Sequence, residues 1–196
     1  MNWGYHASIC ILSLSLIYGC DIFQTREPQQ PTQGTSTYQV PDQPDVVLTN
    51  LEAAIHESNT DNYMRCFADT SSTSQPFSFT PSADVSSYES VFRTWNLSNE
   101  RTYFQNLGKP VNGTPYLYPS SAPNQIFSST DSVVYSMDYT FFYPHNRPGI
   151  PQLVRGKMEL HLKPDARRLW YIQAWIDTKT THDSTWSYIK AVFSAN

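Results

Sequence analysis

The second half of the chain has a two-residue hydrophobic period, and this pattern restricts the fold more than any other feature. Apolar and polar side chains alternate over 133–143, 154–162 and 170–177. Alternation of this kind predicts β-strands with one face in a core and the other face towards solvent. The connections at 144–151 and 163–168 have the length of hairpin loops, so we expect neighbouring strands to be antiparallel.

The first half shows helical spacing instead. Apolar residues recur three and four positions apart over 47–55, directly after Pro44, which suits a first helical position. We expect a second short helix over 61–67 with Thr60 as its cap, and a third from Ser98 to Leu107. The first half therefore predicts helices that precede the sheet.

Three shorter elements complete the expected fold. The pattern predicts a short strand at 77–79 and one irregular strand at either 116–118 or 125–127. A C-terminal helix, capped by Asp183 or Ser184, would carry Trp186, Ile189 and Phe193 on one face. This order predicts an α+β fold, with N-terminal helices packed on a curved antiparallel sheet and an extra C-terminal helix.

Two segments resemble the NTF2-like (SnoaL-like, cystatin-like α+β) superfamily. They are VVLTNLEAAIHESNTDNYMRCF at 46–67 and WYIQAWID at 170–177, and the resemblance covers roughly 44–178. It implies a cone in which a curved sheet wraps a long helix and leaves a pocket at the wide end. It also implies pairing of two chains through the sheet face. The superfamily includes isomerases, dehydratases and members without known chemistry, so the fold alone does not assign a function.

The N-terminus resembles that of a bacterial lipoprotein. Residues 7–17 are apolar over a length typical of a signal peptide and too short to span a bilayer. The run Ile17-Tyr18-Gly19-Cys20 resembles a lipobox, which implies cleavage before Cys20 and lipid attachment to its sulfur. The start, MNWGYH, has no Lys or Arg, so an ordinary secretory signal peptide and a cytoplasmic start remain alternatives.

The lipobox divides the chain into three parts. We expect a lipoprotein signal peptide at 1–19, a lipid anchor and disordered tether at 20–43, and an NTF2-like domain at 44–196. The tether is polar and rich in Pro and Gln, which is typical of a flexible spacer. The expected location is therefore the cell envelope, on the periplasmic or outer face of a membrane.

Two sets of residues are candidates for chemistry or binding. Asp138 and His161, on neighbouring strands, would form a dyad that moves protons next to a carbonyl, although their polar neighbours favour solvated faces. Strict alternation places four residues on one face that mixes aromatic rings with an amide and an acid, which is typical of a ligand pocket. These residues are Tyr171, Gln173, Trp175 and Asp177. The alternatives are packing of that face against a helix or another chain, and an Asp177 that satisfies backbone donors at a helix end.

Composition and spacing exclude several classes of function. The net charge is −4 and there is no Lys/Arg cluster, so we expect no nucleic-acid partner. The histidines lack paired ligand spacing, and there is no glycine-rich phosphate loop, so we expect neither a metal nor a cofactor. Cys66, beside Phe67 in a helical pattern, is expected to be buried packing.

The sequence thus favours an envelope-anchored lipoprotein whose domain binds a small apolar ligand or a protein partner without catalysis. The alternative is an isomerase or dehydratase that uses a pocket carboxylate. A third interpretation is a filled cone that binds no ligand.

Overall fold

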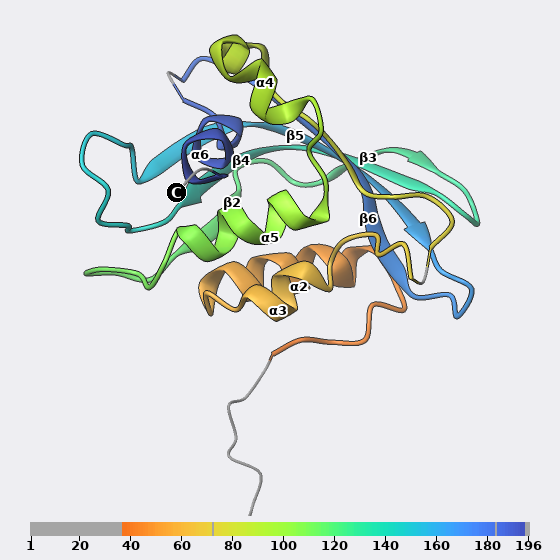
Figure 1. Ribbon diagram of the computed structural model, residues 1–196. Helices are drawn as coiled ribbons and strands as arrows, with labels where there is room; N and C mark the ends of the chain where they lie inside the picture. Colours follow the sequence, from red (N-terminus) through yellow and green to blue (C-terminus); the bar gives the residue numbers. More distant parts are fainter. Residues whose placement is uncertain (1–36, 72, 183, 195–196) are drawn as a thin grey trace, which may run out of the picture. The chain divides into compact units, whose positions relative to one another are not determined.

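A six-stranded sheet and the helices that cover it form the folded domain (Figure 1). The computed structural model describes residues 37–71, 73–182 and 184–194, so Cys20 and the predicted signal segment lie outside the described residues. The strands are β1 (Ser78–Thr80), β2 (Tyr116–Pro119), β3 (Asn124–Ser128), β4 (Val133–Phe142), β5 (Leu153–Pro164) and β6 (Trp170–Thr178). The helices are α2 (Pro44–His56), α3 (Thr60–Met64), the 3₁₀ helix η1 (Ala83–Tyr88), α4 (Glu89–Phe92), α5 (Leu97–Asn106) and α6 (Trp186–Ser194).

The three long strands form the predicted antiparallel meander, with β5 between β4 and β6. Both candidates for the irregular strand are formed, because β2 pairs with one half of β4 and β3 with the other half. Pro119 and Pro123 interrupt this edge, and proline cannot donate to a strand ladder, so one long strand becomes two short ones. The short strand β1 pairs with β6 in parallel, which makes the sheet mixed rather than purely antiparallel.

The helix starts differ slightly from the predicted ones. Asn59 caps α3 in place of Thr60, because its side chain accepts the backbone N–H of Asn62. Asn96 caps α5 in place of Ser98, and its backbone N–H bonds back to the side chain of Asn99. In both places two neighbouring polar residues suit a cap, so the local sequence does not choose between them.

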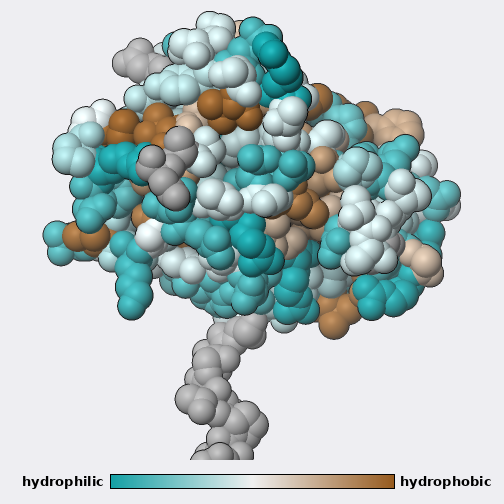
Figure 2. All heavy atoms as spheres, in the orientation of Figure 1, coloured by the Kyte–Doolittle hydropathy of each residue, from teal (hydrophilic) through white to brown (hydrophobic). Residues whose placement is uncertain are grey.

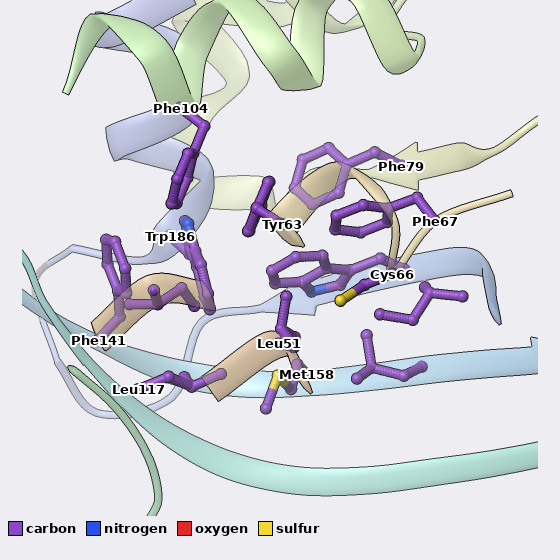
Figure 3. Packing of buried hydrophobic residues seen from close by; sticks show 14 of the residues in the cluster. Leu51, Tyr63, Cys66, Phe67, Phe79, Phe104, Leu117, Phe141, Met158 and Trp186 are labelled. Atoms are coloured by element: carbon purple, nitrogen blue, oxygen red, sulfur yellow. The ribbon is translucent and has the colours of Figure 1, made fainter. Parts of the chain in front are cut away.

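The C-terminal helix α6 lies between α5 and the sheet, where it is part of the core. Trp186 stacks on Phe141 of β4 with ring centroids 4.1 Å apart (Figure 3). It also meets Trp175 of β6 edge-on at 4.6 Å. On the α5 side, the Asn106 amide donates to the carbonyl of Phe193 at 2.8 Å. The helix therefore fills part of the interior between α5 and the sheet.

The core also includes residues from segments in which no helix or strand was predicted, and it includes Cys66. Val85 of η1 and Phe92 of α4 are buried, although no element was predicted there. Cys66 is buried as predicted, and burial raises the pKa of its thiol to about 12.

On the face shown in Figure 2, hydrophobic residues form small separate patches among hydrophilic ones.

The residues just before α2 belong to the folded domain, whereas we predicted them to lie in the tether. The backbone N–H of Gln39 donates to the Asn50 side chain, and the Asn50 amide donates to the Gln39 carbonyl, both at 2.8 Å. The Pro41 carbonyl accepts the backbone N–H of Trp170 at 2.7 Å. Because a buried asparagine and the start of β6 satisfy this backbone, the folded domain begins by Thr37 rather than at Pro44.

Candidate functional site

The structure does not bring the predicted dyad together. Asp138 is exposed and lies opposite Lys157, while His161 lies opposite Val134. The two candidates are therefore four positions apart along β4, about 13 Å at the usual rise of a strand. His161 instead contacts Glu159, with 2.7 Å between Nε2 and Oε1. Both candidates lie on the face of the sheet away from the helices.

A β-bulge separates the four residues predicted to share one face of β6. Gln173 is the extra residue, because it is left out of the register with β5. Alternation reverses after it, so Trp175 and Asp177 are buried in the interior, whereas Tyr171 and Gln173 are half-buried on the other face. The predicted common face was wrong because a bulge shifts every later side chain by one position.

Asp177 binds the start of α6. Its Oδ1 accepts the hydroxyl of Tyr139 at 2.8 Å, and its Oδ2 accepts the backbone N–H and hydroxyl of Ser187 at 2.7 and 2.6 Å. The Tyr139 oxygen in turn accepts the backbone N–H of Trp186 at 2.7 Å. Burial raises the pKa of the Asp177 carboxyl, and the hydrogen bonds from Ser187 and Tyr139 oppose that rise. Asp177 thus satisfies donors in the first turn of α6, where a helix favours a negative charge.

A second carboxylate, Glu100, lies at the centre of the interior. Its Oε1 accepts the Lys190 ammonium and the Tyr63 hydroxyl, each at 2.6 Å, and its Oε2 accepts the Trp95 indole N–H at 2.7 Å. Neither Glu100 nor Lys190 has any exposed side-chain surface. This pair was not predicted from the sequence. The available signal was Lys190 itself, next to Ile189 on the apolar face of the C-terminal helix.

Aromatic rings surround the Lys190 ammonium. The Nζ atom lies 3.9 Å from the ring centroids of both Phe79 and Trp175, at distances typical of cation–π contacts. Burial lowers the pKa of Lys190, while the Glu100 and Asp177 carboxylates oppose that change. The interior acids are therefore already occupied by groups of the protein, and their hydrogen-bonding capacity faces Lys190 and the start of α6 rather than a substrate.

An open cleft of about 460 Å³ lies on the outside of the domain, next to α3. Its walls come from the segment before α2, from α3, and from the β5–β6 hairpin, with Arg101 of α5 also contributing. The apolar part of the lining is Tyr38, Val40, Pro41, Met64, Phe67, Leu169, Trp170 and Tyr171. Tyr171 is the one predicted pocket residue that lines this cleft.

Charged residues of the cleft are mostly paired. Arg101 contacts Asp61, and Arg167 contacts Asp165, each at 3.1 Å. Partial burial acts to raise the pKa of Asp165, but hydrogen bonds from Leu169 and Arg167 outweigh it and lower that pKa overall. Two of the three arginines in the lining are thus neutralised by a neighbouring carboxylate.

The third arginine, Arg65, stacks on an aromatic ring. Its guanidinium carbon lies 3.5 Å from the ring centroid of Tyr38. One N–H contacts the Asn62 side chain at 3.4 Å. Within residues 37–71, 73–182 and 184–194, no carboxylate forms an ion pair with Arg65.

The part of the chain that the structure describes contains no cluster of three His, Cys, Asp or Glu side chains placed to hold a metal ion. Over the same residues, no helix has both the length and the hydrophobicity of a membrane-spanning segment.

Comparison with known proteins identifies the fold. No protein-family model matches the sequence, and no curated protein matches it. Among solved structures, an NTF2-like superfamily protein from Salmonella enterica has a TM-score of 0.50 at 14% identity, covering 70% of this chain and 89% of that one. The fold is NTF2-like. The predicted α+β architecture with an additional C-terminal helix is therefore confirmed.

Two further NTF2-like neighbours come from Novosphingobium aromaticivorans. One is a proposed scytalone dehydratase, with a TM-score of 0.54 at 8% identity over 71% of this chain and 84% of that one. The other is a proposed aromatic ring hydroxylase, with a TM-score of 0.54 at 10% identity over 74% and 92%. At such low identity these NTF2-like structures define the fold and carry no activity over to this chain.

Proposed function

We propose that this protein is an envelope-anchored, non-catalytic NTF2-like protein that binds its ligand in the external cleft. The observation that carries this proposal is the burial of Lys190 against Glu100, because it fills the interior with a side chain of the protein itself. Trp186 fills the neighbouring space between Phe141 and Trp175. A substrate would have to displace α6 before it could reach either interior carboxylate.

The anchor rests on the lipobox resemblance at Cys20. Mass spectrometry of the membrane fraction tests it directly. We expect the N-terminal peptide of the mature protein to begin at Cys20 and to carry lipid, and the Cys20→Ala variant to lose both the lipid and the membrane association. An unchanged mass and unchanged membrane association in that variant would remove the anchor from the proposal.

The alternative function is an isomerase or dehydratase that uses an interior carboxylate. It has one structural argument, namely that burial raises the pKa of Asp177 and so favours a form that could donate a proton. This enzyme would need α6 to move away, since α6 covers both Asp177 and Glu100.

Native-state hydrogen exchange separates the two functions. If the interior stays closed, the backbone amides of α6 exchange only through global unfolding, as do those of β4 and β5. If α6 opens on its own, its amides exchange with a distinctly lower free energy of opening than those of the central strands. That second result would support the enzyme and argue against the proposal.

A further inference from the structure

We propose that the cleft binds a small organic anion, with a carboxylate or phosphate group on Arg65 and an apolar body on the aromatic wall. This inference deepens the proposed function and rests on its assignment of the cleft as the binding site. It concerns the chemical class of the ligand, which neither the fold nor the anchor specifies.

The size and the walls of the cleft suit a small molecule. Its volume of about 460 Å³ falls within the range of about 300–1,000 Å³ typical of ligand pockets. Leu169 and Trp170, from the β5–β6 hairpin, line it together with Tyr38 and Met64. A ligand that leaves water for this space would bury apolar surface against these residues, which favours an apolar body.

Arg65 supplies the recognition of charge. Stacking on Tyr38 occupies the flat face of the guanidinium and holds it in one orientation. The N–H groups lie in the plane of the guanidinium, so stacking leaves their edge available to a planar or tetrahedral oxyanion. Asn62 accepts one N–H at the long distance of 3.4 Å, which leaves donors for a ligand.

The other charged residues of the lining are Asp61, Asp69, Arg101, Asp165 and Arg167. Asp61 already pairs with Arg101 and Asp165 with Arg167, so these four residues present little net charge to a ligand. Among the arginines of the lining, Arg65 alone has no carboxylate partner within the described residues. An incoming anion would therefore complete a pair at Arg65.

The position of the cleft allows two sources for such an anion. Tyr38 lines the cleft, and residues 21–36 connect this segment to Cys20. At about 3.3–3.6 Å per residue, those residues span at most about 50–60 Å. An anchored domain would thus hold the cleft within reach of lipid headgroups as well as of free anions, and both present the same phosphate or carboxylate chemistry.

Calorimetric titration with hexyl phosphate tests the inference, using the full chain with Cys20→Ala so that no lipid is attached. We expect saturable binding, at least tenfold weaker binding of hexanol, and at least a tenfold loss of hexyl phosphate affinity in Arg65→Gln. Arg93→Gln is the matched control, because it removes the same charge from an exposed position at the end of α4. The Arg93→Gln variant should bind hexyl phosphate with the same affinity as the parent protein.

Three outcomes would overturn the ligand class: no saturable binding of hexyl phosphate, equal affinity for hexanol, or equal losses in Arg65→Gln and Arg93→Gln. Amide spectra of each variant establish that the fold is intact, so a loss of binding cannot be attributed to unfolding.

Vesicles distinguish the two sources. If phosphatidylglycerol vesicles retain the protein through Arg65 and hexyl phosphate releases it, the anion is a lipid headgroup. If vesicles do not retain the protein but hexyl phosphate binds, the anion is a free molecule. Both results support the shared chemistry. The proposed function fails separately, through the Cys20→Ala and hydrogen-exchange experiments, because neither depends on Arg65.

Discussion

Lys190 donates to Glu100 with 2.6 Å between Nζ and Oε1, and solvent reaches neither side chain. The pair joins α6 to α5 across the interior of the domain. Removing two charges from water is unfavourable, and their attraction offsets this only when the remaining donors and acceptors are satisfied. Tyr63 and Trp95 satisfy the other lone pairs of Glu100. The pair therefore specifies where α6 docks more than it adds to stability.

Removing one partner of this pair should lower the free energy of unfolding more than replacing both partners together. We expect Glu100→Gln and Lys190→Met each to lower the free energy of unfolding by about 3–5 kcal/mol, because each leaves one buried group unpaired. The double variant should lose clearly less than the sum of the two. Urea denaturation of the four proteins measures this coupling, and additive losses would contradict it. The exposed pair of Arg168 and Asp131 is the control, where each change should amount to less than about 1 kcal/mol.

Asp177 should make stability fall as pH rises through the acid range. Its pKa is raised above the usual 3.8, so between these two values the folded state binds more protons than the unfolded state. The stability that this pKa difference adds is therefore fully present below pH 3.8. It is lost as pH rises through the pKa that Asp177 has in the folded state. The stability difference between the parent protein and Asp177→Asn should shrink across this window, by up to about 1.4 kcal/mol per pH unit. Urea titrations at several pH values test the slope.

Gly156 lacks space for a side chain. A Cβ atom there would lie 2.7 Å from the Tyr139 hydroxyl oxygen and 2.9 Å from the backbone carbonyl of Thr178. Gly156→Ala would push Tyr139 away from Asp177, so we expect a loss of about 1–3 kcal/mol in thermal or urea unfolding. Gly113→Ala is the control, since its Cβ would meet its nearest neighbour at an ordinary 3.5 Å. Equal stability of the two variants would show that Tyr139 can move without penalty.

The thiol of Cys66 should be inert in the folded protein. It is 1% exposed, and burial raises its pKa to about 12, so almost no reactive thiolate forms near neutral pH. In a chain with Cys10→Ser and Cys20→Ser, labelling by a maleimide should follow global unfolding in urea. Fast labelling without denaturant would indicate local opening around α3.

The long strands could be predicted from sequence because each strand buries one face. In β4, for example, the buried residues Met137, Tyr139 and Phe141 alternate with more polar ones. The prediction failed where a single backbone irregularity changes the register, as the bulge at Gln173 does for Trp175 and Asp177. The interior pair was missed for a different reason. Glu100 and Lys190 are 90 positions apart, and a charge that is buried by a distant partner resembles an exposed one in the sequence.

The location of α6 also has a consequence for the order of events when the protein is made. Trp186, Lys190 and Phe193 are core residues of α6, which follows every strand of the sheet along the sequence. Synthesis supplies them after the sheet and α5, so the sheet and α5 exist for a time without the helix that packs against both. During that interval Glu100 lacks its counter-ion Lys190, and Trp175 lacks its contact with Trp186. Completion of the core is thus delayed until α6 emerges, and a nascent chain of this kind presents its aromatic interior to chaperones before the core closes.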